Sequence, residues 1–195
     1  MTPAEWLAAN DARAMLLHLR LTPWRPRKPR LFACAVTRRI GDGLQKERGR
    51  RALELAEQFA EGAVLKREMI AARSAASGLP RCAADPLAWR AAELVACNTP
   101  EVVTVLRDVF GNPFSSPDVD PSWLSWGDGR IREMAQAAYD DRLLPAGTLD
   151  NDRLGVLADA LEEAGCSDEG MLRHCRDARV HVRGCWVLDL MLGKA

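Results

Sequence analysis

Apolar side chains recur every three to four residues over most of the chain. The pattern is clearest over residues 150–164, where one stripe of apolar positions ends just before Gly165. This spacing is typical of an amphipathic helix, and glycine is a common residue after a helix end. The same criteria predict helices that begin at Thr2, at Asn10 or Asp11, at Asp85, and at Ser167 or Asp168, and a helix after Gly62 that runs through Leu65 and Met69. Further helices are predicted over residues 30–40, 46–62, 99–110 and 128–143.

Proline and glycine mark the breaks between these helices. Three prolines, Pro23, Pro26 and Pro29, prevent residues 21–30 from being helical throughout, and the run 78–80 is expected to stop a helix. Residues 111–121 read as a loop that is followed by one helical turn at 120–124. The segment 182–192 is apolar nearly all round, so its periodicity fits a buried strand or a buried helix; we predict a helix from its surroundings.

These elements predict an all-α fold, a single compact domain of eight to ten helices over residues 1–195, with a possible weak subdivision near 111–126. No apolar stretch is long enough to cross a bilayer, and the first residues lack the pattern of a secretory signal. We therefore expect a cytoplasmic protein with no membrane partner, in which the six cysteines are free thiols.

Charge is unevenly distributed although the formal net charge is zero. Residues 1–90 hold 17 Lys and Arg against 9 Asp and Glu, and residues 91–195 hold 10 against 18. Two interpretations fit this asymmetry. Either the basic part faces an acidic partner, or the two halves pack on each other through complementary charge.

A cluster of cysteine and histidine near the end of the chain is the sharpest chemical signal. Zinc is held by about four nitrogen or sulfur ligands, and Cys166, His174, His181 and Cys185 are candidates for a zinc site, with Cys175 as an alternative to His174. His181 and Cys185 are four residues apart, so on a helix they would share a face. The spacing matches no common zinc finger, and no CxxC pair is present. The alternative is a packed core end with buried thiols and hydrogen-bonded imidazoles.

A second hypothesis for the same segment is that Cys185 is a catalytic nucleophile. His181, Cys185 and Asp189 would form one stripe on a helix, as a base, a nucleophile and an orienting carboxylate require. The all-apolar surroundings favour instead a buried Asp189 paired with Arg183 or another arginine. No phosphate-binding loop or known hydrolase motif is present, and the chain has no identified catalytic or cofactor-binding residue.

The basic stretch between Arg20 and Arg51 suggests an alternative function, because its cations surround Trp24 and a nucleic acid needs both phosphate contacts and stacking. A solvated face or pairing with acidic residues explains the same pattern. Trp123 and Trp126 suggest either a binding surface or anchoring of a loop. The basic stretch comprises Arg20, Arg25, Arg27, Lys28, Arg30, Arg38, Arg39, Lys46, Arg48, Arg50 and Arg51.

Several phrases of the chain resemble a family of uncharacterised bacterial proteins that is abundant in planctomycetes. They are EWL (5–7), RLFAC (30–34), RDVFGNPF (107–114), DPSWL (120–124), LADALEEAGC (157–166), HCR (174–176) and HVRGCWVLDL (181–190). The likeness covers almost the whole chain. The chain departs from the family after Cys34, where relatives often carry a second cysteine and this chain has Val36 and Thr37. The resemblance implies a common domain and assigns no activity.

Since no catalytic or cofactor motif was found, the leading expectation is a protein-binding or regulatory helical module. The alternatives are nucleic-acid binding through Arg20–Arg51 and a zinc-stabilised domain or zinc enzyme that uses the C-terminal cluster. The sequence leaves open whether the protein is an enzyme and whether it forms oligomers.

Overall fold

The computed structural model describes residues 1–22, 24–41, 44, 46–115 and 117–194. Within these residues the chain is all-α and contains no β-strand, which confirms the predicted fold class. No helix in this part of the chain combines the length and the hydropathy that spanning a membrane requires. Pro23, one of the three prolines expected to break the chain, lies outside the described residues.

Contacts along the chain divide it into two compact units. The first unit is Met1–Val109 and the second unit is Phe110–Ala195, so the division falls inside the last turn of a helix, close to the start of the predicted subdivision at 111–126. Whether the chain acts as one domain stays a prediction.

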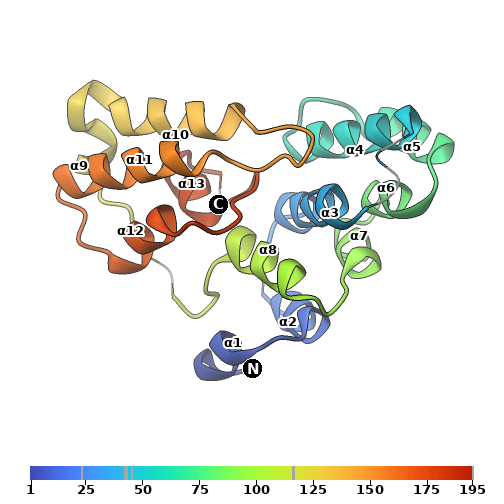
Figure 1. Cartoon of the computed structure of the whole chain (residues 1–195), viewed down its shortest axis with the longest axis horizontal. Coiled ribbons are helices and arrows are strands. Elements are labelled where there is room, and N and C mark those ends of the chain that lie inside the picture. Colours follow the sequence, from blue (N-terminus) through green and yellow to red (C-terminus); the bar gives the residue numbers. More distant parts are fainter. Residues whose placement is uncertain (23, 42–43, 45, 116, 195) are drawn as a thin grey trace. The chain divides into compact units, whose positions relative to one another are not determined.

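The first unit contains eight helices in its described residues, and Figure 1 shows them in blue to green. Local signals set two of their beginnings: Thr2 forms a capping box with Glu5, and Asp11 accepts hydrogen bonds from the amides of Arg13 and Ala14. The helices are α1 (Pro3–Ala8), α2 (Ala12–Leu19), α3 (Arg27–Ile40), α4 (Glu47–Ala60), α5 (Lys66–Ala75), α6 (Gly78–Ala83), α7 (Ala88–Val95) and α8 (Pro100–Phe110).

Helix α3 is the centre of the first unit. It packs against α4, α6 and α7, and every residue from Lys28 to Thr37 is buried. It begins at Arg27, earlier than the predicted Arg30, because Pro29 falls in the first turn, where a missing amide hydrogen costs nothing. The sequence also predicted that a helix ends at 78–80. The structure instead has helix α6 there, and Pro80 again lies in the first turn.

Cationic side chains of the first unit bind the carboxyl ends of its helices. Arg30 donates to the carbonyl oxygens of Ala83, Asp85 and Pro86 behind α6, and Lys28 donates to Val109 O at 2.7 Å in α8. The last carbonyls of a helix lack partners within the helix, and cations favour that end of its dipole. In the same way, Arg13 donates to the carbonyl oxygen of Ala96 at the end of α7. Arg107 donates to the carbonyl oxygens of Trp6, Leu7 and Ala9 at the end of α1.

The second unit is built from short helices around an apolar core. Asp120, Asp150 and Asp168 cap the beginnings of three of them through their own side chains. The core contains the predicted stripe of Leu154, Leu157, Ala158 and Leu161. The helices are α9 (Pro121–Ser125), α10 (Arg130–Asp140), α11 (Asn151–Glu163), α12 (Glu169–Arg176) and α13 (Trp186–Met191), with a short 3-10 helix, η2 (Trp126–Gly129).

The segment 182–192 is helical only in part. Helix α13 covers Trp186–Met191, whereas Val182 forms an isolated antiparallel bridge with Thr148, which also bridges to Leu143. Gly184 has a φ of 94°, outside the right-handed helical region, and a turn closes from Cys185 N to Val182 O at 2.9 Å. The helix therefore begins at Trp186, four residues after the predicted start, because the chain forms a turn at Gly184.

Candidate metal centre

Three potential metal ligands meet inside the second unit. The ligand atoms of His174, His181 and Cys185 all lie within 4.8 Å of one another, and all three residues are buried. His174 Nε2 and Cys185 Sγ are 3.2 Å apart, and the two imidazole rings meet edge to face at 4.7 Å between centroids. A group of this composition can hold a metal ion such as zinc, which prefers nitrogen and sulfur ligands.

Each ligand comes from a different local structure. His174 lies on α12, whose start is capped by Asp168 through a hydrogen bond to the Met171 amide at 2.8 Å. Cys185 is the residue before α13 and lies at the end of the turn at Gly184. We call His174, His181 and Cys185 the trio. Its geometry depends on how α12 and α13 pack, and these two helices are in contact.

His181 lies in an extended segment rather than on a helix. Its carbonyl oxygen accepts a hydrogen bond from Leu149 N at 2.9 Å, which fixes the segment beside residues 148–149. Its Nε2 lies 3.2 Å from Asp177 O. A carbonyl only accepts, so Nε2 is the donor of this hydrogen bond, and in the neutral ring Nδ1 then keeps its lone pair. A ring oriented in this way by a backbone carbonyl is typical of histidine ligands.

His174 has a different partner, which sequence reasoning did not identify. The indole Nε1 of Trp186 donates a hydrogen bond to His174 Nδ1 at 3.1 Å. Because indole nitrogen only donates, Nδ1 must be unprotonated, and the proton of the neutral ring lies on Nε2, beside Cys185 Sγ. Gly111 packs closely on Trp186, since a Cβ at that position would lie 3.0 Å from the indole ring.

This network does not resemble an activated cysteine nucleophile. A thiolate paired with an imidazolium needs protons on both ring nitrogens, and the Trp186 donor opposes a proton on Nδ1. Cys185 is also fully buried, out of reach of a substrate. The stripe of His181, Cys185 and Asp189 proposed from helical spacing does not form, because α13 begins only after Cys185.

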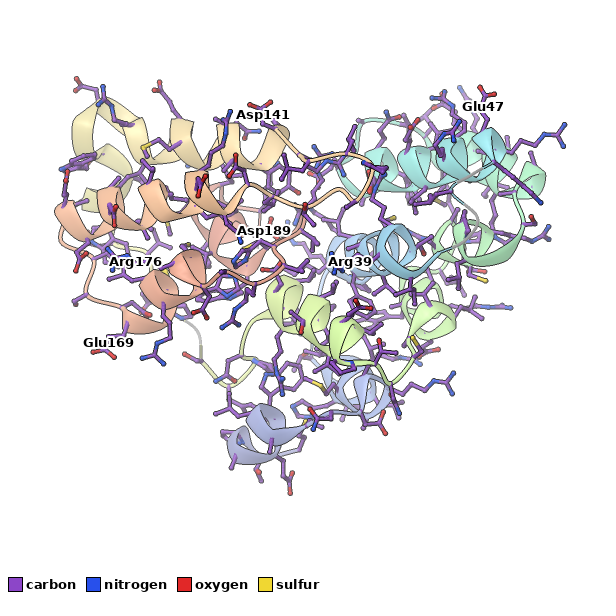
Figure 2. All side chains as sticks on the ribbon, in the orientation of Figure 1. Arg39, Glu47, Asp141, Glu169, Arg176 and Asp189 are labelled. Carbon is purple, nitrogen blue, oxygen red and sulfur yellow. The ribbon has the colours of Figure 1, made fainter. Side chains whose placement is uncertain are left out.

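The fourth candidate ligand from the sequence, Cys166, is not grouped with His174, His181 and Cys185. It follows α11, and burial raises the pKa of its thiol. Its role as a ligand stays a prediction. Asp189 lies inside the second unit on α13, whereas Asp141 and Glu169 project from the surface (Figure 2). The ion pair of Arg183 is with Asp140, at 3.9 Å.

The basic stretch is largely engaged within the first unit. Lys28 and Arg30 are buried against carbonyl oxygens, and Arg38 forms two hydrogen bonds with Glu57 at 2.7 and 3.0 Å. Burial opposes charge on Arg38, but the hydrogen bonds and charge of Glu57 outweigh it and raise the pKa of Arg38. Further pairs join Arg20 to Glu93 and Arg27 to Glu61. Trp123 and Trp126 pack against the core of the second unit, as loop anchors do.

Comparisons of the chain with protein-family models, with curated proteins and with solved structures give no significant match.

Proposed function

We propose that the second unit binds one zinc ion through His174, His181 and Cys185, and that the ion fastens the C-terminal segment to α12. The observation that carries this proposal is the meeting of three buried ligand atoms within 4.8 Å. Zinc ligands lie about 2.0–2.3 Å from the metal, which places them about 3.3–3.6 Å from one another in a tetrahedron. The 3.2 Å between His174 Nε2 and Cys185 Sγ is close to this separation.

A structural role is favoured over a catalytic one. A catalytic zinc keeps an open position that substrate can reach, whereas His174, His181 and Cys185 are all buried. The bound ion would cross-link α12, the turn at Gly184 and the extended segment around His181. Each of these elements is short, so the ion replaces contacts that a longer helix would supply.

His174, His181 and Cys185 supply three of the four ligands that tetrahedral zinc takes, so the proposal leaves one position to a further ligand.

Zinc binding through His174 Nε2 requires the loss of the hydrogen bond between Trp186 and His174. A neutral imidazole has one proton, so His174 cannot bind zinc through Nε2 while its Nδ1 accepts the Trp186 hydrogen bond. Binding through Nε2 moves the ring proton to Nδ1, and the indole must then turn away. The Trp186 hydrogen bond and the zinc ion thus compete for His174.

Titration of metal-free protein with Co²⁺ tests the proposal, because a tetrahedral cobalt–thiolate site absorbs strongly through charge transfer. We expect one equivalent to bind, and Cys185→Ser to remove the charge-transfer band while circular dichroism shows that the helices persist. Cys97→Ser, at a half-buried cysteine of the first unit, is the matched control and should leave the band unchanged. A missing band in the wild type, or a band that survives Cys185→Ser, contradicts the proposal.

We further propose that the protein works in a reducing compartment such as the cytoplasm, because none of the six cysteines, which all lie in the described residues, forms a disulfide and a thiolate ligand requires a reduced sulfur. The protein-binding and nucleic-acid-binding roles expected from the sequence stay predictions. Retention on nucleic acid that falls as salt rises would favour the latter role.

A further inference from the structure

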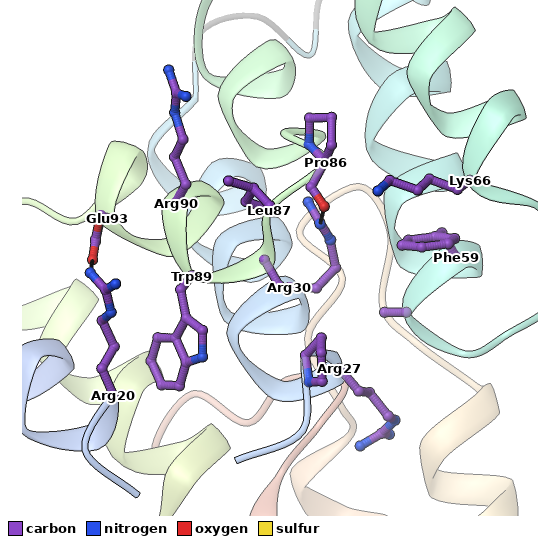
Figure 3. A pocket seen from close by; sticks show the side chains of 13 residues that line it. Arg20, Arg27, Arg30, Phe59, Lys66, Pro86, Leu87, Trp89, Arg90 and Glu93 are labelled. Carbon is purple, nitrogen blue, oxygen red and sulfur yellow. Dashed lines mark hydrogen bonds and ion pairs between the residues drawn. The ribbon is translucent and has the colours of Figure 1, made fainter. Parts of the chain in front are cut away.

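A cavity of about 650 Å³ opens in the first unit, between α4, α5 and α7 and the start of α3. Figure 3 shows Trp89 on one side of it and Phe59 on the other, with Arg30 between them. This volume lies in the range of small-molecule sites, which are about 300–1,000 Å³. The cavity is independent of the cysteine and histidine trio, all of which belongs to the second unit.

The walls of the cavity are mostly apolar and partly aromatic. Trp89 and Phe59 supply rings, and Leu87 is 61% exposed at the rim. The guanidinium carbon of Arg30 lies 5.9 Å from the centroid of the Phe59 ring. Flat apolar walls of this kind favour a planar ring as the body of a ligand.

The lining carries more positive than negative charge. It contains five cationic residues and one carboxylate, that of Glu93, which pairs with Arg20. Lys66 is exposed at the start of α5. Arg90 lies 3.7 Å from Asp85, but Asp85 also pairs with Arg73 at 3.0 Å, so one carboxylate serves two cations.

Arg30 adds a buried charge that is not neutralised by an ion pair in the described structure. It is 2% exposed, its terminal nitrogens bind neutral carbonyl oxygens, and its Nε has no hydrogen-bond partner. Burial therefore lowers the pKa of Arg30, although it stays charged at neutral pH. A buried cation beside an apolar cavity attracts a negative charge into that cavity.

We propose that this cavity binds a small planar aromatic molecule with an anionic group, such as an aryl sulfonate, carboxylate or phosphate. The ring lies against Trp89, Leu87 and Phe59. The anionic group lies toward Lys66, which Figure 3 shows beside Phe59.

Fluorescence titration of the full chain with 1-anilinonaphthalene-8-sulfonate tests this proposal, because this probe joins planar rings to one anion. Its uncharged counterpart, N-phenyl-1-naphthylamine, measures the apolar part alone. We expect one sulfonate probe to bind per chain. Lys66→Gln should weaken the sulfonate about fivefold and leave the uncharged probe unchanged, whereas Leu87→Ser should weaken both.

The matched control is Arg67→Gln, which removes the neighbouring exposed cation of α5 that does not line the cavity. It should leave both probes unaffected. The proposal is overturned if the sulfonate does not bind, or if it binds with an affinity that neither Lys66→Gln nor Leu87→Ser changes. Equal loss of affinity in Lys66→Gln and Arg67→Gln would also overturn it, since it would show only a general effect of charge.

Discussion

The two units of this protein bury polar groups in opposite ways. The first unit holds 18 Lys and Arg against 12 Asp and Glu, and it buries cations such as Lys28 and Arg30 against the carboxyl ends of helices. The second unit holds 9 against 15, and its buried polar side chains include two imidazoles, His174 and His181. One interior is organised by long charged side chains and the other by a compact nitrogen and sulfur cluster.

The two units also differ in how far apart along the chain the residues lie that hold their helices together. In the first unit Arg30 lies more than fifty positions from the carbonyl groups that it binds. In the second unit Asp150 and Asp168 cap helix starts locally, and Cys185 meets His174 across only eleven positions of the chain. The first arrangement needs no ligand, whereas the second has the composition of a metal site.

Removal of zinc should produce the largest effect, and only in the second unit. A ligand present at a thousand times its dissociation constant stabilises the state that binds it by about 4 kcal/mol. Chelation should therefore speed hydrogen exchange in α12 and α13 and leave α3 unchanged. Equal changes in both units would show that zinc does not stabilise the second unit alone.

Arg30→Met should have the next largest effect, in the first unit. The change leaves two buried carbonyl groups and one half-buried carbonyl group without this donor, and the loss of such charged hydrogen bonds costs about 3 kcal/mol. Urea unfolding measures the loss. Arg48→Met, at an exposed arginine, is the control and should cost under about 0.5 kcal/mol. An Arg30 variant as stable as the wild type would show that the buried cation is dispensable.

Trp186→Phe should tighten zinc binding, because it removes the donor that occupies His174 Nδ1 and retains an aromatic ring beside Gly111. The net worth of one hydrogen bond, about 1 kcal/mol, corresponds to roughly a fivefold gain in affinity. Competition with a chromophoric chelator measures it. Weaker binding by this variant would mean that Trp186 supports the metal-bound state.

Arg176→Gln should have the smallest effect. Arg176 pairs with Asp159 and Glu162 on the surface, which raises its pKa but leaves all three side chains in water. The urea midpoint should not shift measurably. A clear loss of stability would show that surface pairs, and not only the core and the trio, hold the second unit together.

The sequence predicted helix starts well where the signal is local. Thr2 caps a helix as expected, and Asp11 and Asp168 each cap as one of the two neighbouring residues predicted there, because a capping side chain binds amides two or three residues away. Helix α6 was missed because glycine and proline at 78–80 read as a stop, although proline fits a first turn.

The candidate site was predicted only in part. His174, His181 and Cys185 were identified from residue type, but the predicted reason for the meeting of His181 and Cys185, a shared helix face, is wrong. The chain turns at Gly184, and a bridge at Val182 places the segment instead. The role of Trp186 depends on the packing of α12 and α13, which spacing along the chain does not reveal.

Zinc binding by His174, His181 and Cys185 is tested by the metal content of untagged protein purified without chelators, measured by mass spectrometry for the wild type and Cys185→Ser. We expect about one zinc ion per wild-type chain and loss of that ion from the variant, with Cys97→Ser retaining it. A folded wild-type protein that contains no metal and binds none when zinc is added would contradict this proposal, and the trio would then be a hydrogen-bonded part of the core.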